Sequence, residues 1–269
     1  MRYKWEQPLS SLVLQCIGER MEEWKFVWGG ANNIALYVKT GKKDIFVKIY
    51  CKKYAGGHDR FSSEFEALTF MRDNGIQCVP QPFACDPSHR IAVYEFVKGR
   101  KFGRKDLSWN TVKQLGIFLL SLYNLRKCFA FSSLPFASEA CFCIEDYFKH
   151  QQRRLRVIRK AAMASSNKLF VKFESERIRP VKNHLEEFVR KRIRNDCDIA
   201  FDDDLLTLNP GDHGLHNVLI SGNRMVFVDF EHAGRDDMAQ VIANALLHPR
   251  IPLPCRLQRE FVSFVFSRL

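Results

Sequence analysis

The sequence contains no uninterrupted apolar run of the roughly 20 residues needed to cross a bilayer. The best candidate, residues 115–125, is short and contains Ser121 and Asn124, so it predicts a buried helix instead. Near the N-terminus the apolar stretch 9–17 is broken by Ser10, Ser11 and Gln15, which does not fit the apolar core of a signal peptide. We therefore expect a soluble, cytoplasmic protein.

Paired metal-binding cysteines and internal repeats are also lacking. The nine cysteines include no C-x-x-C pair, and the closest two, Cys141 and Cys143, do not have the usual zinc spacing. In a cytosolic protein such cysteines are mostly reduced thiols that pack as small hydrophobic side chains. No repeat or low-complexity tract is visible, which argues against a solenoid. Since 46% of the residues are hydrophobic, wholesale disorder is excluded.

Acidic residues are scarce in one part of the chain. Residues 149–195 contain fifteen Lys or Arg and four Glu, which gives this segment a net charge of +11 out of +12 for the whole chain. Such a segment is either a solvated helical face or a contact for an anionic partner. Its aromatics, Phe170, Phe173 and Phe188, form no obvious stacking platform and no RNA-binding motif is present, so we expect no specific nucleic-acid partner.

The first hundred residues are predicted to be rich in strands and the rest to be helical. Strands are expected at 24–28, 34–39, 44–50 and 91–97, with a turn at 40–43 and a helix running from a cap at Ser62 or Ser63 to about Asn74. Further helices are expected at 112–125, 144–164, 181–194, 239–247 and 259–266, and short strands at 205–208, 218–220 and 225–230. This order predicts an α+β protein with a small β-rich N-lobe, residues 1–97, and a larger helical C-lobe, residues 98–269.

Three residues of the C-terminal half carry a recognisable chemistry. Asp212 and Asn217 lie five positions apart in a tight loop, and Asp229 ends the apolar strand that follows. Phosphoryl transfer needs such a set, because one carboxylate orients the attacking hydroxyl while an amide oxygen and a second carboxylate hold magnesium. The D-x-x-x-x-N spacing alone is weak evidence, and the strand that ends in Asp229 makes it moderately specific.

The N-terminal half supplies the other parts of a nucleotide site in the expected order. A glycine loop between two strands can cover phosphates with its backbone N–H groups, through Gly29, Gly30, Asn32 and Asn33. Lys48 is a lone cation on a strand, and Glu64 or Glu66 on the following helix is its expected partner. The strand that ends at the joint between the lobes offers the backbone of Glu95 and Val97 to an adenine.

At residues 210–217, 228–231 and 234–237 the chain resembles the aminoglycoside phosphotransferase and choline kinase family, a branch of the protein-kinase-like fold. The resemblance spans about residues 24–249 and implies an ATP-dependent kinase that uses Mg²⁺ and phosphorylates an acceptor hydroxyl. It implies Asp212 as the catalytic base, Asn217 and Asp229 as magnesium ligands, and Lys48 as the ligand of the α- and β-phosphates, with Glu64 preferred over Glu66 as its partner.

Two positions depart from the family pattern. Pro210 stands where many members have a histidine before Gly-Asp, and Met238 follows Asp237 where members often have a proline. The form with proline in the loop looks like a bacterial subgroup of unassigned substrate. Neither change touches a transferring group.

Several residues near the motifs have competing interpretations. His213 and His216 are expected to fill the loop or to contact substrate, since two histidines without a third clustered ligand make a poor zinc site. Glu231 is a candidate beside the metal or the substrate. Asp236 and Asp237 are expected to brace the loop or to cap the next helix.

The basic segment bears on the acceptor. In the family the helical insertion before the catalytic loop contributes to acceptor binding, and a pocket for a cationic aminoglycoside would be acidic. Arg153 and Arg154 therefore favour an anionic acceptor: a sugar phosphate, a nucleotide sugar or a phosphorylated glycolipid. Alternatives are a kinase of lipopolysaccharide or another cell-envelope saccharide at an anionic membrane surface, a nucleotide-binding pseudokinase, and a basic RNA-binding module. The sequence leaves open the oligomeric state and the choice between ATP and GTP.

Overall fold

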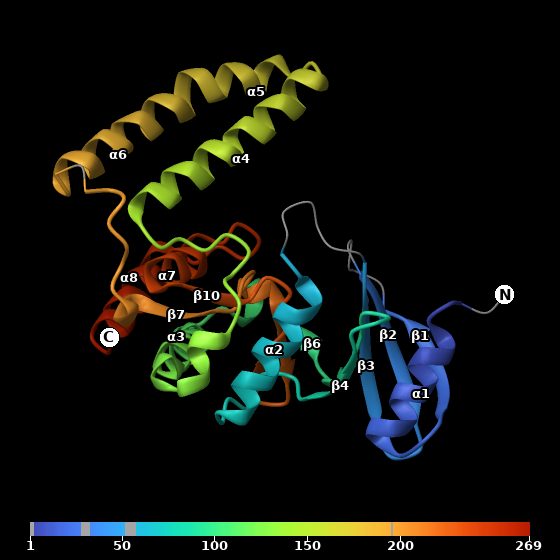
Figure 1. The fold of residues 1–269 in the computed structure, drawn as a ribbon. Coiled ribbons are helices and arrows are strands. Elements are labelled where there is room, and N and C mark those ends of the chain that lie inside the picture. The colour runs from blue at the N-terminus through green and yellow to red at the C-terminus, as the bar shows by residue number, and fades with distance from the viewer. Residues whose placement is uncertain (1–2, 28–32, 52–57, 195) are drawn as a thin grey trace. The chain divides into compact units, whose positions relative to one another are not determined.

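The structure is a computed structural model that describes residues 3–27, 33–51, 58–194 and 196–269. The chain forms two compact units. One comprises Met1–Ser138 together with Leu206–Leu269, and the other comprises Glu139–Leu205 (Figure 1). The predicted boundary between lobes at residues 97 and 98 falls inside the first unit and stays a prediction.

A five-stranded antiparallel sheet forms the N-terminal part of the first unit. Its order is β1-β2-β3-β5-β4, built from β1 (Met21–Phe26), β2 (Asn33–Thr40), β3 (Asp44–Tyr50), β4 (Pro82–Asp86) and β5 (Ile91–Glu95). The predicted β2–β3 hairpin is confirmed, and its register pairs Ala35 with Lys48. Residues 96 and 97 lie outside β5, and β4 occupies a stretch for which no strand was predicted.

Helix α1 (Glu6–Ile17) covers one face of this sheet. Its Leu9 and Val13 are fully buried against Ile45, Val47 and Ile49, which share one face of β3 as their alternation predicts. The apolar stretch that does not fit a signal peptide is therefore an amphipathic helix of the core.

Helix α2 (Arg60–Asp73) packs against β4 and β5, and its Glu64 meets the side chains of β3 that point away from the α1 core. The predicted cap at Ser62 or Ser63 is wrong, because Asp59 caps the helix by accepting a hydrogen bond from the Phe61 amide at 3.2 Å. Asp59 also binds the Arg90 guanidinium at 2.6 Å, and this hydrogen bond lowers the pKa of the carboxyl. Asp59 thus caps α2 and also pairs with the residue directly before β5, which fixes where the helix begins.

The remainder of the first unit combines helices with two small antiparallel sheets. The helices are α3 (Trp109–Asn124), α7 (Met238–Leu247) and α8 (Cys255–Phe266). One sheet joins β10 (Gly234–Asp237) to β7 (Leu206–Asn209), and the other has the order β6-β8-β9, from β6 (Arg100–Lys101), β8 (Val218–Ser221) and β9 (Arg224–Phe227). Phe118 of α3 stacks on Phe227 of β9, with ring centroids 3.9 Å apart. This packing ties the β8–β9 hairpin to the helical core.

The second unit is a helical hairpin that carries the basic segment. Helix α4 (Ile144–Ala164) has the predicted bounds and is followed by α5 (Lys168–Phe173), a π-helical turn (Glu174–Ile178) and α6 (Arg179–Arg192). The buried Glu174 accepts hydrogen bonds from Arg159 of α4 at 3.1 Å and from Arg179 of α6 at 2.9 Å. Near the other end of the hairpin, Arg190 binds Glu145 at 2.8 Å. These ion pairs hold α4 and α6 antiparallel (Figure 1).

Among the described residues, no helix is both long enough and apolar enough to span a membrane.

Candidate active site

A buried ion triad joins three segments of the first unit. The Lys48 ammonium of β3 donates to both Glu64 carboxylate oxygens of α2, at 2.8 and 2.9 Å, and to Asp229 Oδ1 at 2.7 Å. The side chains of Lys48 and Glu64 are only 12% and 4% exposed, whereas that of Asp229 is 44% exposed. The triad therefore has one open side, at Asp229.

The pKa shifts in the triad follow from burial and from the presence of two carboxylates beside one ammonium. Burial acts to lower the pKa of Lys48, but Glu64 and Asp229 outweigh it and the pKa is raised, so the ammonium stays charged. Burial and the nearby Asp229 raise the pKa of Glu64, while Lys48 acts in the opposite direction. For Asp229 the attraction of Lys48 outweighs burial and lowers the pKa, so this carboxylate is ionised at neutral pH.

The structure pairs Lys48 with Glu64, the preferred of the two predicted partners. Glu64 lies on the buried face of α2, where the Tyr50 hydroxyl also donates to it at 2.6 Å. Glu66 is two residues further along the helix and is exposed to solvent. The helical period of 3.6 residues places these two glutamates on different faces.

The loop after β7 is held in place by buried hydrogen bonds. Asn209 Nδ2 donates to Asp236 at 2.6 Å, and Asn209 Oδ1 accepts from the Gly211 amide at 2.8 Å. Gly211 has φ +82°, and a Cβ at this position would lie 2.7 Å from His232. A glycine is thus required both by the backbone conformation and by the close approach of the segment after β9.

His213 has a structural place in this loop. It is 5% exposed, and its ring nitrogens face the carbonyl oxygens of Gly211 and Val241, each at 2.8 Å. Burial lowers its pKa. Of the two predicted roles, loop filling fits this geometry, because the ring is buried and both of its nitrogens face backbone carbonyls.

The Asp212 carboxylate extends from the loop and lies between two histidines. Its Oδ1 is 2.9 Å from Nε2 of His248, and its Oδ2 is 3.3 Å from Nε2 of His216. Asp212 itself is 48% exposed, while the two imidazoles are 16% and 14% exposed. The histidines hold the carboxylate in place and leave it accessible to solvent.

Asn217 and Asp229 are connected through the β8–β9 hairpin. Asn217 Nδ2 donates to the Asp212 carbonyl at 2.7 Å, and the Val228 amide donates to the Asn217 carbonyl at 2.9 Å. Asp229 follows directly and has φ +71°, a left-handed conformation that is rare for a residue with a Cβ. The hairpin thus brings the Asn217 amide and the Asp229 carboxylate to the same region as the loop after β7.

Glu231 connects this region to the glycine loop. It is 8% exposed, and its carboxylate accepts a hydrogen bond from Asn33 Nδ2 and lies 3.7 Å from the Arg60 guanidinium. The other loop positions predicted to cover the phosphates, Gly29, Gly30 and Asn32, lie outside the described residues. Glu231 is therefore engaged by the N-terminal part of the unit, and its predicted role beside the metal stays a prediction.

The other predicted site residues have partners outside the triad. Glu95 ends β5, and its carboxylate accepts from the Gln81 amide at 3.1 Å, while Val97 lies just beyond the strand. Arg153 and Arg154 belong to the second unit, where both bind Glu139, the former at 2.6 Å. Asp237 caps α7 through the Ala239 amide at 3.2 Å, and Asp236 braces Asn209, so both roles predicted for these acids are confirmed.

The sequence analysis missed His248. This residue ends α7 directly before Pro249, and a proline disfavours helical backbone at the residue before it. The side chain reaches back to the loop after β7, where Gly214 makes room for the ring, because a Cβ on that glycine would lie 2.5 Å from it. The His-Pro step at a helix end is the only local signal for this placement.

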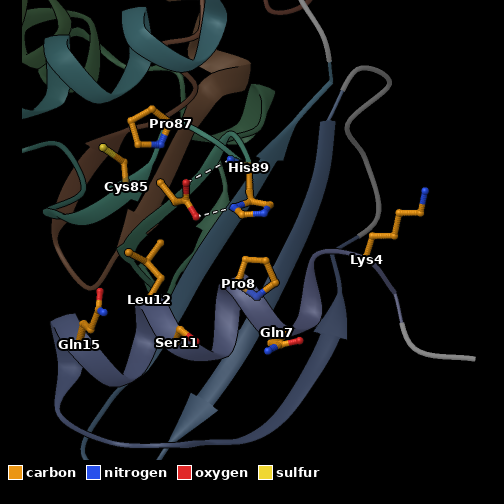
Figure 2. A pocket seen from close by; sticks show the side chains of 10 residues that line it. Lys4, Gln7, Pro8, Ser11, Leu12, Gln15, Cys85, Pro87 and His89 are labelled. Carbon is orange, nitrogen blue, oxygen red and sulfur yellow. Dashed lines mark hydrogen bonds and ion pairs between the residues drawn. The ribbon is translucent and has the colours of Figure 1, made fainter.

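A surface pocket lies elsewhere in the first unit (Figure 2). It is lined by residues of α1, including Gln7 and Leu12, and by the turn between β4 and β5, where His89 binds Asp86 at 2.7 Å. None of the predicted site residues lines it.

The arrangement described above agrees with a comparison against protein-family models. Residues 23–263 match the model described as the phosphotransferase enzyme family. The chain belongs to this family. A search of curated proteins finds no significant match.

Solved structures that resemble this phosphotransferase confirm the fold. A spectinomycin phosphotransferase in complex with ADP and spectinomycin has a TM-score of 0.67 and 17% identity over 96% of this chain and 79% of its own. A choline kinase from Cryptosporidium parvum has a TM-score of 0.58 and 18% identity over 91% and 72% of the two chains. The fold is therefore the α+β protein-kinase-like fold, as the sequence analysis predicted.

The triad makes a prediction about the reactivity of Lys48 in this phosphotransferase. Glu64→Gln is expected to lower the pKa of Lys48, because it removes one of two nearby negative charges, and to speed acylation of its amine about tenfold for each pKa unit. Mass spectrometry after brief treatment with acetic anhydride measures the rate. Glu66→Gln is the matched control on the exposed face of the same helix and should react like the wild type. Equal rates in all three proteins would contradict the assignment.

Proposed function

We propose that this phosphotransferase transfers the γ-phosphoryl group of ATP, bound with Mg²⁺, to a hydroxyl group of a small molecule or glycan in the cytoplasm. The observation that supports this proposal best is the Lys48–Glu64–Asp229 triad next to the loop that presents Asp212 and Asn217. The ADP in the related spectinomycin phosphotransferase supports a nucleotide as the phosphate donor. A related amicoumacin kinase, in complex with AMP-PNP and Ca²⁺, supports a nucleotide together with a divalent ion. It has a TM-score of 0.61 and 15% identity over 99% of this chain and 77% of its own.

The residues present fit a magnesium ion. Asn217 and Asp229 supply an amide oxygen and a carboxylate, the hard oxygen ligands that Mg²⁺ prefers. Asn217 donates its Nδ2 to the loop, and its Oδ1 has no hydrogen-bond partner among the described residues. Asp229 is the exposed member of the triad, so it can exchange the Lys48 ammonium for a metal ion. When bound, Mg²⁺ would neutralise charge on the phosphates.

The residues of the chain then have separate tasks. Lys48 provides a fixed positive charge for the phosphates, and Glu64 keeps that charge in position from its buried side. Asp212 aligns the acceptor hydroxyl and accepts its proton, while His216 and His248 hold the carboxylate. Because the transition state of phosphoryl transfer is loose, positioning and charge neutralisation supply most of the rate enhancement.

Nucleotide binding is testable without knowing the acceptor. Mg-ATP is expected to raise the melting temperature of the wild type, and Asp229→Ala is expected to lose most of this rise because it removes a metal ligand. A thermal-shift titration with Mg-ATP and Mg-GTP measures both effects. Asp212→Asn is the matched control, since it leaves the metal ligands intact and should keep the rise. The absence of a rise with either nucleotide would overturn the proposal, and a rise without turnover of any acceptor would favour a pseudokinase.

For the acceptor we propose an anionic molecule such as a sugar phosphate, a nucleotide sugar or a phosphorylated glycolipid. Seven basic side chains of the second unit form no ion pair with any residue that the structure describes: Arg156, Lys160, Lys168, Lys172, Arg177, Arg192 and Arg194. Arg153 and Arg154 share the single carboxylate of Glu139, so one positive charge of this pair is not balanced. The cations are thus in excess over the acids that could neutralise them.

The acceptor class is tested by local removal of charge. With a sugar phosphate acceptor found by screening, the triple variant Arg153→Gln, Arg154→Gln, Arg156→Gln is expected to raise KM about fivefold or more, since each exposed charge pair contributes up to about 1 kcal/mol. A control with the same change in charge is Lys25→Gln, Lys39→Gln, Lys42→Gln in the first unit, where each lysine is exposed and paired with a glutamate, and its KM should equal that of the wild type. Steady-state kinetics compare the two. An unchanged KM, or turnover of cationic aminoglycosides only, would contradict the anionic acceptor.

A second candidate places the acceptor, a cell-envelope saccharide, at an anionic membrane surface. Val181, Leu185 and Phe188 follow one face of α6 and are 60%, 52% and 56% exposed. Leu169 of α5 is 84% exposed, and the same helices carry the unpaired cations. Apolar side chains among basic residues are typical of helices that lie on anionic lipid surfaces.

Vesicle co-sedimentation tests the second candidate. The protein is expected to bind vesicles of phosphatidylglycerol and phosphatidylcholine, and to bind pure phosphatidylcholine weakly. Leu185→Ser with Phe188→Ser should weaken binding about tenfold or more, because each apolar side chain contributes about 1.5–3 kcal/mol when buried. Phe129→Ser with Ile117→Ser removes two exposed apolar side chains of the first unit as the control. Binding that depends on charge alone would count against insertion of these residues.

A further inference from the structure

Three side chains at the catalytic loop converge on one point. One ligand atom each from Asp212, His216 and His248 lies within 4.8 Å of the others. The two imidazoles stack with their ring centroids 4.5 Å apart and their planes 23° apart, and both direct Nε2 toward the same carboxylate. Two imidazoles and a carboxylate form a ligand set that suits transition metals such as zinc, whereas magnesium prefers oxygen ligands alone.

The scaffold holds these side chains before any ion binds. His216 belongs to the 3-10 turn Leu215–Asn217, and His248 is fixed by the end of α7. Because Gly214 has no side chain, the His248 ring lies directly on the loop backbone. Both histidine side chains are largely buried, whereas Asp212 is half exposed, so the cluster is open on the carboxylate side.

We propose that Asp212, His216 and His248 form a binding site for a divalent transition metal, distinct from the magnesium ligands Asn217 and Asp229. The contacts of 2.9 and 3.3 Å between imidazole and carboxylate are close to the ligand separations of a tetrahedral zinc site, in which each metal–ligand distance is about 2.0–2.2 Å. Three protein ligands leave the fourth position to water or to a small molecule.

The surroundings of the site limit its affinity. Metal binding uses the Nε2 lone pair of each ring, so the ring proton must be on Nδ1. His216 Nδ1 is buried without a hydrogen-bond partner among the described residues. His248 Nδ1 accepts a hydrogen bond from the Arg250 amide at 3.4 Å, and this bond must break before Nδ1 can carry the proton. A metal-binding histidine usually donates this proton to a carboxylate or carbonyl, and loss of such a partner weakens binding by about 10–100-fold. The site therefore fits an ion that binds reversibly.

Occupancy has a consequence for phosphoryl transfer, and this step rests on the proposed function. A metal on Asp212 occupies the carboxylate that aligns the acceptor hydroxyl. Zinc at this site is therefore an inhibitor of transfer.

Equilibrium dialysis with Zn²⁺ alone tests the site, without nucleotide or acceptor. The wild type is expected to bind one more equivalent of zinc than His248→Ala and His248→Phe. The Phe variant keeps a planar ring against Gly214, in case the Ala variant does not fold. The control, His184→Ala, removes an exposed histidine of α6 and should bind like the wild type. All variants keep the nine cysteines, so zinc bound by thiols is the same in each. Equal stoichiometry in all four proteins would overturn the proposal.

The inhibitory role has a separate readout. Zinc is expected to inhibit phosphotransfer by the wild type and by His184→Ala in excess Mg-ATP, and EDTA added with fresh Mg²⁺ should restore activity. The residual activity of His248→Phe should be at least about tenfold less sensitive. Bound zinc without inhibition would overturn the inhibitory role. If the protein proves inactive with every acceptor, the proposed function fails while the dialysis result still decides the metal site.

Discussion

The site depends on the ion pairs of the Lys48 ammonium. One cation lies between two carboxylates that come from α2 and from the segment after β9, so it connects the sheet, the helix and the segment after β9. Removing one partner of a buried ion pair typically costs about 3–5 kcal/mol, because the remaining charge stays unpaired in a poorly solvated place. The pair with Glu64 is nearly closed to solvent, whereas Asp229 is open. The buried Lys48–Glu64 pair is therefore the fixed part of the triad, and Asp229 is the part that a ligand can reach.

Close packing against the backbone of the loop after β7 is the second constraint on the site. Gly211 lies against His232 of the segment that carries Asp229, and Gly214 lies against His248 at the end of α7. At both positions a Cβ would come within 2.7 Å of its neighbour. The loop can therefore present Asp212 and Asn217 only while these neighbours are in place, and the buried His213 adds a third tie, to Val241. The orientation of Asp212 thus depends on elements that follow it by up to 36 residues in the chain.

The parts of the site that the sequence predicts are those whose spacing carries the chemistry. The two-residue period of a strand and the 3.6-residue period of a helix can be read from neighbouring residues, and they indicate which face Lys48 and Glu64 occupy. The helical period also predicts the bounds of α4. His248 could not be predicted, since its place depends on a packing contact with Gly214 that leaves no local pattern. Helix α1 was not predicted, because its apolar residues were compared only with a signal peptide. The cap of α2 was predicted wrongly, because Asp59 and two serines all lie where a helix cap can form.

The second unit shows why net charge is a poor guide to a binding surface until the ion pairs are known. Glu174 binds both Arg159 and Arg179 inside the hairpin, and Arg190 binds both Glu145 and Glu186. These pairs are structural, because they hold two helices whose facing sides have few buried apolar residues. What distinguishes the unit is the set of cations that remains after this pairing, along α4 and α5 and at the end of α6. An acceptor or surface that binds there is attracted by these unpaired charges. The number of basic residues in the sequence therefore overstates the strength of the attraction, but it gives the correct sign of the charge.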